Sequence, residues 1–226
     1  KNGFLYVSDI ADANDDDVDF VDGTAKVSRR NRAAQMPPIE TILKRNQTIM
    51  VQVAKDTLGT KGCRLTNYAT LPGRYTVLMP TVSHLGVSRK IDSDKERDRI
   101  RRILREVRPK NLGLICRTAA EGQSKDDLQD DVKYLSKLWD KINRKMESEK
   151  APALLHEDLS PILRTVRDQF TEDVQRITID NDTEYRRIIS FLDIYAPNLK
   201  KRVKVYKSRM PLFEKMGIED EIVKAL

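Results

Sequence analysis

Arg117 and Thr118 stand next to each other directly after a short apolar run, residues 112–116. A guanidinium presents a planar fork of donors that matches phosphate oxygens, and a neighbouring hydroxyl adds a short donor. The point where a strand ends and a helix begins is also a recurrent anion site. The order strand, Arg-Thr, small residues, helix therefore indicates a candidate phosphate site, although the dipeptide itself is common and identifies no ligand.

Two further segments carry residue types that suit nucleic acid. Phe4 follows a glycine on a predicted strand, and Lys61 precedes a glycine near a later strand. On a small β-barrel, an exposed aromatic ring can stack on a base while an ammonium meets the backbone. The alternative is that Phe4 is buried in a core. The second segment, residues 86–90, ends in Arg89 and Lys90.

The composition favours a polyanionic partner. The 226 residues carry a formal net charge of +7 and a pI near 9.3, with 39% hydrophobic and 6% aromatic residues. No apolar run reaches the roughly 20 residues that a membrane span needs, and no signal peptide is evident. Cys63 and Cys116 are far apart, which excludes a local Cys-x-x-Cys metal site and favours a reduced, cytoplasmic setting.

The segments between these residues predict a mixed α+β protein. An acidic stretch at 9–19 and a basic one at 26–32 lack apolar periodicity, so residues 11–38 are predicted to be a long, mobile loop. The acidic run lacks the glycine and terminal glutamate of a calcium loop, which favours a solvated charge run. Period-two alternation predicts a small antiparallel β-unit, most of a barrel, from strands at 3–7, 48–53, 63–68 and 74–80.

Helices and strands alternate in the rest of the chain, as in an α/β layer. Helices are predicted from Ser93 to Val107, over 124–148, from Ser160 to 170, over 184–195 and from 218 onward. Strands are predicted at 112–116, 176–180 and 202–206. The long helix should bury one stripe, made of Leu128, Val132, Leu135, Leu138, Ile142 and Met146, with Trp139 beside it.

Several ordered motifs resemble the bacterial ribonuclease E/G family. They cover nearly the whole chain outside the loop at 11–38, and their combination and order are specific. The matching segments are residues 42–56, 59–66, 71–80 (Leu-Pro-Gly-Arg-Tyr-Thr-Val-Leu-Met-Pro), 86–90 (Gly-Val-Ser-Arg-Lys), 113–119 (Gly-Leu-Ile-Cys-Arg-Thr-Ala) and 211–213 (Pro-Leu-Phe).

The resemblance implies roles for matching positions. Phe4 and Lys61 fall where the family grips single-stranded RNA, and Arg117 with Thr118 falls on the pair that binds a 5′-monophosphate. Val77 falls where the family packs against the terminal nucleotide, and Arg89 would support the same pocket. The implied function is RNA binding and 5′-end sensing within a single-strand-specific endoribonuclease of RNA processing and decay.

The resemblance also implies an organisation. Residues 1–72 would be a partial OB-fold, 73–158 a 5′-sensor region and 159–226 part of an RNase H-like domain. The family's Mg²⁺-binding aspartates lie on a deoxyribonuclease-I-like domain that would follow residue 226, and its zinc-link cysteines lie beyond that. The chain is therefore expected to be an interior fragment, inactive alone, with no catalytic or metal residue of its own, from a homo-oligomeric enzyme.

Two alternatives stay open from the residues. One is an RNA-binding module without catalysis, and the other is a ribosome-associated or DNA-binding scaffold. The scaffold would bind through the basic residues 200–202 and an arginine-rich helix. Because Asp94, Glu96 and Asp98 interleave with that helix, a solvated charged face is favoured for it. Its arginines are Arg97, Arg99, Arg101, Arg102 and Arg105.

Overall fold

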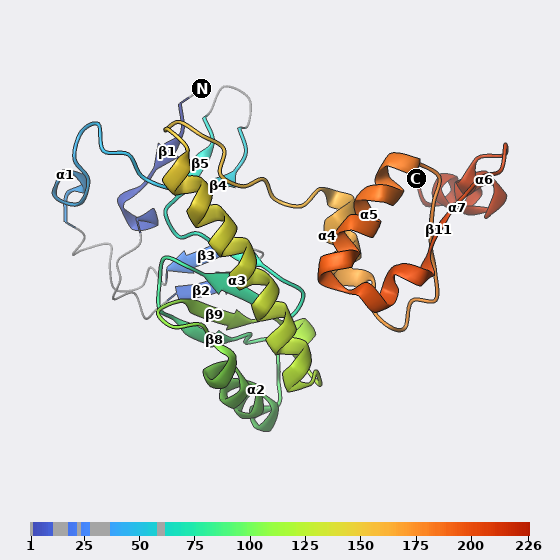
Figure 1. Cartoon of the computed structure of the whole chain (residues 1–226), viewed down its shortest axis with the longest axis horizontal. Helices are drawn as coiled ribbons and strands as arrows, with labels where there is room; N and C mark the ends of the chain where they lie inside the picture. Colours follow the sequence, from blue (N-terminus) through green and yellow to red (C-terminus); the bar gives the residue numbers. More distant parts are fainter. Residues whose placement is uncertain (1, 11–17, 22–23, 28–36, 58–61) are drawn as a thin grey trace. The chain divides into compact units, whose positions relative to one another are not determined.

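A computed structural model describes residues 2–10, 18–21, 24–27, 37–57 and 62–226 (Figure 1). The chain divides into two compact units, residues 1–157 and 158–226, and each is described by itself. The predicted mixed α+β class is confirmed, with several small sheets and no closed barrel among the described residues.

The first unit begins with a three-stranded sheet in the order β1-β5-β4, formed by β1 (Phe4–Leu5), β5 (Arg64–Thr66) and β4 (Gln52–Lys55). The prediction of a purely antiparallel unit was wrong, because β1 runs parallel to β5 while β4 runs antiparallel to it. The period-two alternation that predicts a strand says nothing about the direction of its partner.

The charged region predicted as a loop contains a hairpin. Strands β2 (Val18–Val21) and β3 (Thr24–Val27) pair antiparallel, with Val18 opposite Val27. The loop prediction was therefore wrong at these eight positions; the rest of 11–36 lies outside the described residues. Two single-turn helices flank this region, η1 (Val7–Asp9) and α1 (Ile39–Ile42).

A four-stranded sheet forms the centre of the first unit. Its order is β6-β7-β9-β8, with β6 (Leu71–Pro72), β7 (Thr76–Met79), β9 (Gly113–Cys116) and β8 (Leu85–Val87). β9 pairs antiparallel with β7 and parallel with β8. The strand predicted at 74–80 thus belongs to this sheet and not to the first. Every residue of β7 and β9 is buried, as expected for central strands covered on both faces.

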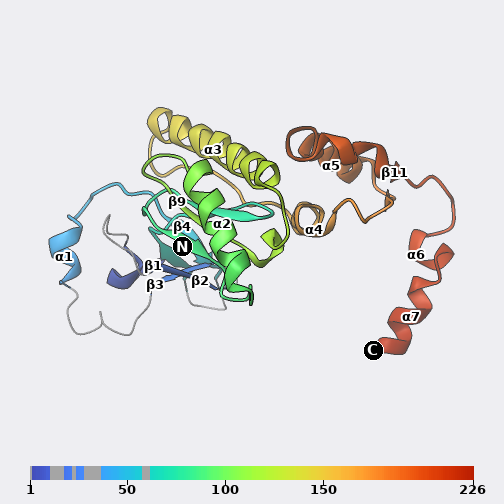
Figure 2. The same cartoon turned by 90° about the horizontal axis from the view of Figure 1, so that it is seen from below.

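Two helices cover one face of this sheet (Figures 1 and 2). α2 (Asp94–Val107) packs against β8 and β9, α3 (Lys125–Ser148) packs against β6 and β7, and the two helices contact each other. Both begin where predicted, because the side chains of Ser93 and Ser124 accept hydrogen bonds from the first-turn amides.

The predicted stripe of α3 lies in the main core with one exception. Leu128, Val132, Leu135 and Ile142 are buried and Leu138 packs against them, whereas Met146 is 44% exposed. Met146 lies near the end of the helix. Trp139 packs against the core, as predicted.

The second unit alternates helix and strand as predicted. α4 (Pro161–Gln169) starts at an N-cap serine, β10 (Ile177–Ile179) pairs parallel with β11 (Val203–Val205), and α5 (Asp182–Tyr195) packs against both strands. A 3-10 helix (Pro197–Arg202) precedes β11. The short α6 (Leu212–Lys215) and α7 (Ile218–Ala225) end the unit.

Candidate phosphate-binding site

Three segments far apart in the sequence meet where the strands of the central sheet end. Cys116, the last residue of β9, lies opposite Thr76 of β7 and Val87 of β8. The pairing continues for one step beyond the strands: the Arg117 N–H donates to the Tyr75 carbonyl at 2.8 Å, and the Ser88 N–H donates to the Cys116 carbonyl at 2.9 Å. The residues after β8 and β9 are therefore held side by side by backbone hydrogen bonds.

Two hydroxyls lie together at this sheet end. Ser88 Oγ and Thr118 Oγ1 are 3.0 Å apart, and Thr118 is exposed at the start of a 3-10 turn, Thr118–Ala120. Ser88 was inside a segment singled out from the sequence, but it was not named as a ligand. The exposed residues Arg89 and Lys90 follow Ser88 in the sequence, so two cationic residues come directly after one member of the hydroxyl pair.

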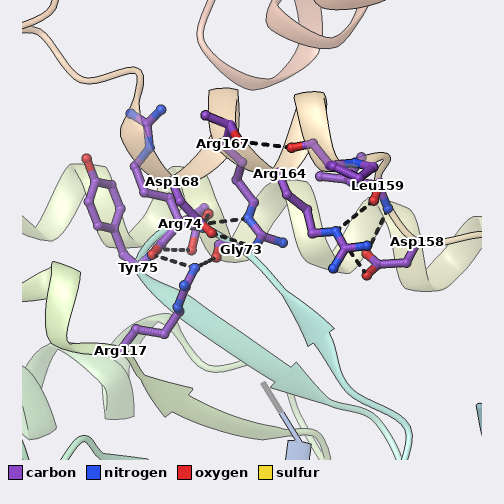
Figure 3. A network of polar contacts seen from close by, with 12 residues as sticks. Gly73, Arg74, Tyr75, Arg117, Asp158, Leu159, Arg164, Arg167 and Asp168 are labelled. Carbon is purple, nitrogen blue, oxygen red and sulfur yellow. Dashed lines mark hydrogen bonds and ion pairs between the residues drawn. The ribbon is translucent and has the colours of Figure 1, made fainter. Parts of the chain in front are cut away.

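Arg117 is half-buried and anchored on one side of its guanidinium. Its Nη1 donates to the Gly73 carbonyl at 2.6 Å and to the Arg74 carbonyl at 3.2 Å (Figure 3). These contacts hold the side chain at the end of β9 and next to the turn that leads into β7. The sequence predicted Arg117 and Thr118 as neighbours at a strand end, and the structure places both there.

A buried carboxylate that the sequence reasoning missed organises the same turn. Asp131 of α3 is 6% exposed and accepts from the N–H groups of Arg74 at 3.0 Å, Tyr75 at 3.0 Å and Thr76 at 2.8 Å, and from the Thr76 hydroxyl at 2.8 Å. The sequence spacing indicates that this carboxylate is buried. Asp131 lies three residues after Leu128 and four before Leu135, so it is on the apolar face of the helix.

A second acidic residue holds the connection between the Arg-Thr pair and α3. Glu96 of α2 accepts from Arg99 at 2.6 and 2.7 Å and from the Gly122 N–H at 2.9 Å, while Arg99 also donates to the Gln123 carbonyl. Hydrogen bonds lower the pKa of Glu96 to about 2. Those from Arg99 have the largest effect, and the one from the Gly122 N–H comes second. Gly122 has φ of +74°, which favours glycine.

Val77 does not face an open site in this structure. Its side chain is 0% exposed and packs with Tyr68, Met79, Val82 and Ile115 in a second small core. Alternation along β7 places Leu78 toward the helices and Val77 on the opposite face, which is also covered. Val77 therefore packs in a core in this structure, and its contact with a terminal nucleotide stays a prediction.

Two exposed aromatic residues lie on the first sheet and directly after its strand β1. Phe4 is 53% exposed, so the alternative of a buried phenylalanine is wrong, and Tyr6 two residues later is 58% exposed. Arg64 lies 5.5 Å from the Tyr6 ring centroid and forms an ion pair with Asp9 at 2.8 Å. Tyr6 was missed, although its period-two spacing from Phe4 was a usable signal. Lys61 lies outside the described residues.

Cys63 and Cys116 are free thiols, and burial raises the pKa of Cys116 to about 12. No group of three or more His, Cys, Asp or Glu side chains among the described residues could hold a metal ion. None of the described helices is long and apolar enough to cross a membrane.

Comparisons with known proteins agree on one family. The sequence profile described as "Ribonuclease E/G family" matches residues 70–226. Ribonuclease G of Escherichia coli strain K12 is 34% identical over 226 residues, which is all of this chain and 44% of that protein. Ribonuclease E of Nostoc sp. PCC 7120 is 34% identical over 229 residues, which is all of this chain and 31% of that protein. The chain thus spans less than half the length of these relatives.

Proposed function

The chain belongs to the ribonuclease E/G family, and from this premise we propose that it is the RNA-binding and 5′-monophosphate-sensing portion of a single-strand-specific endoribonuclease. The observation that carries the proposal is the meeting of Arg117, Thr118 and Ser88 at the end of the central sheet. Arg89 would add positive charge to the same site.

This arrangement can distinguish a phosphate end from a hydroxyl end. A 5′-monophosphate carries nearly two negative charges and three acceptor oxygens, which suit a guanidinium and a pair of hydroxyls. Hydrogen bonds to charged groups contribute about 1.5–3 kcal/mol each. Two or three of them, after losses to solvent screening, correspond to a preference of roughly tenfold to a few hundredfold.

We assign single-strand binding to the first sheet. The exposed rings of Phe4 and Tyr6 can stack on bases, which is sequence-tolerant because every base has a π-face. Lys61 would contact the RNA backbone. In this proposal residues 1–72 are a partial OB-fold, 73–158 the 5′-sensor region and 159–226 part of an RNase H-like domain.

Hydrolysis is proposed for the intact enzyme, where Mg²⁺ would activate water. The described residues do not offer a fitting set of metal ligands, so the roles proposed for this chain are binding and positioning. The inactivity of this chain alone, assembly into homo-oligomers and cytoplasmic residence stay predictions.

Fluorescence anisotropy with short single-stranded RNAs that differ only in a 5′-phosphate or 5′-hydroxyl tests the sensing role. The phosphorylated RNA should bind at least about tenfold more tightly. Arg117→Ala should remove this preference. Arg101→Ala is the matched control, because Arg101 is paired on the exposed face of α2 and should leave the preference intact.

Two results would contradict the proposal. Equal affinity of the unaltered chain for both RNAs would exclude 5′-phosphate sensing. A large fall in the melting temperature of Arg117→Ala, with the preference retained, would instead give Arg117 a structural role.

The ion pairs of α2 argue against the alternative that this helix is part of a nucleic-acid-binding scaffold. Arg97, Arg99 and Arg101 each lie within 4 Å of an acidic side chain three residues earlier, as on a solvated charged face. Competition between single-stranded RNA and duplex DNA separates the two functions. Preferential displacement by duplex DNA would favour the scaffold.

A further inference from the structure

We infer that Asp131 is the positioning residue of the phosphate sensor and that it acts on Arg117 through three consecutive peptide units. The inference rests on the proposed function, because it assigns Asp131 a part in 5′-phosphate recognition. It concerns a buried residue on α3.

The three peptide units between Gly73 and Thr76 each join the Asp131 carboxylate to Arg117, two of them through its side chain and one through its backbone N–H. In the first, the Arg74 N–H donates to Asp131 while the Gly73 carbonyl accepts from Arg117 Nη1. In the second, the Tyr75 N–H donates to Asp131 while the Arg74 carbonyl accepts from the same Nη1. In the third, the Thr76 N–H donates to Asp131 while the Tyr75 carbonyl accepts from the Arg117 backbone N–H.

This pattern aligns two peptide dipoles between the Asp131 carboxylate and the Arg117 guanidinium, and a third between the carboxylate and the Arg117 backbone N–H. In a trans peptide the N–H and the C=O point in opposite directions, so a carboxylate on one side orients every carbonyl toward the other side. Hydrogen bonds in such chains polarise one another, and a buried carboxylate makes stronger hydrogen bonds than a neutral acceptor. The charge of Asp131 therefore fixes the carbonyls that hold the guanidinium in place.

The close approach of the helix to the turn depends on Gly73. A Cβ built at this position would lie 2.5 Å from both carboxylate oxygens of Asp131. Atoms cannot approach this closely, so any larger residue would displace the carboxylate from the three N–H groups. The turn and the carboxylate thus form one unit, and Arg117 is oriented by it.

Asp131→Asn tests the inference, because it keeps the size of the side chain and removes its charge. The side-chain nitrogen of asparagine is a hydrogen-bond donor, so it would face a backbone N–H donor at a position where a carboxylate oxygen of Asp131 accepts. In the anisotropy assay with 5′-phosphate and 5′-hydroxyl RNAs, we expect the preference for the phosphate to fall at least about fivefold, with affinity for hydroxyl-ended RNA within about twofold of the unaltered chain. The double variant Asp131→Asn/Arg117→Ala should lose no more preference than Arg117→Ala.

A matched control separates positioning from general destabilisation. Ile142→Ala removes a buried side chain of the same helix that belongs to the main core, and it should lower the melting temperature while keeping the phosphate preference. If Asp131→Asn does not fold, Gly73→Ala replaces it, and the preference should fall in the same way.

The outcomes distinguish the two proposals. No preference in the unaltered chain overturns the proposed function itself. A preference that Arg117→Ala abolishes but that folded Asp131→Asn retains overturns only the positioning role, and so does a retained preference in Gly73→Ala. Equal loss of preference in Asp131→Asn and Ile142→Ala also overturns it, because the effect would then follow stability alone.

Discussion

Replacement of Glu96 by glutamine should make the protein less stable at neutral pH and remove part of its sensitivity to acid. Glu96 links α2 to the turn before α3, since its carboxylate accepts from both Arg99 and the Gly122 N–H. Glutamine keeps the shape of the side chain but has no charge, so it tests the contribution of the ionised carboxylate.

The magnitude follows from the pKa of Glu96, which is lowered from 4.5 to about 2. At full strength this fall corresponds to about 3 kcal/mol, because one pH unit of pKa change equals about 1.4 kcal/mol. Arg99 is about one-third exposed, so solvent screens the pair, and we expect about 1 kcal/mol instead. A lowered folded-state pKa stabilises the protein above pH 4.5, and this stabilisation is lost as the pH falls toward 2.

Urea denaturation followed by far-ultraviolet circular dichroism, at several pH values from 6 to 2.5, measures this effect. The difference in unfolding free energy between the unaltered chain and Glu96→Gln should be about 1 kcal/mol at pH 6 and shrink steadily below pH 4.5. Asp98→Asn is the control, since its pair with Arg101 is exposed and should contribute less than about 0.5 kcal/mol. A difference that is the same at every pH would refute the reasoning.

Two further predictions concern the thiols and a helix cap. Iodoacetamide at pH 8 should modify Cys63 but not Cys116 in the native chain, because burial raises the pKa of Cys116 to about 12. Mass spectrometry would show both cysteines modified in urea. Modification of Cys116 in the native chain would contradict its burial. Ser124→Ala should lower the unfolding free energy by about 1 kcal/mol in urea titrations, because Ser124 and Asp127 form a capping box at the start of α3. An unchanged midpoint of the urea unfolding transition would show that the cap does not stabilise the protein.

The sequence by itself determined most of the helices and the two central residues of the candidate site. Serine caps and apolar spacing placed the starts of α2, α3 and α4, because capping and amphipathicity act over a few neighbouring residues. Arg117 and Thr118 could be predicted because an apolar run ends directly before them. Local patterns of this kind need no knowledge of distant partners.

Only the tertiary structure decided which strands pair and what surrounds the site. β7 is a threonine followed by three apolar residues, a pattern that names no partner strand. Its place in the central sheet, which buries Val77, depends on β9 more than 30 residues later in the sequence. Likewise, Asp131 finds its donors 55 to 57 residues earlier in the chain. A carboxylate on an apolar helix face indicates that a buried partner exists, but which backbone amides lie opposite it is determined by how the helix packs on the sheet.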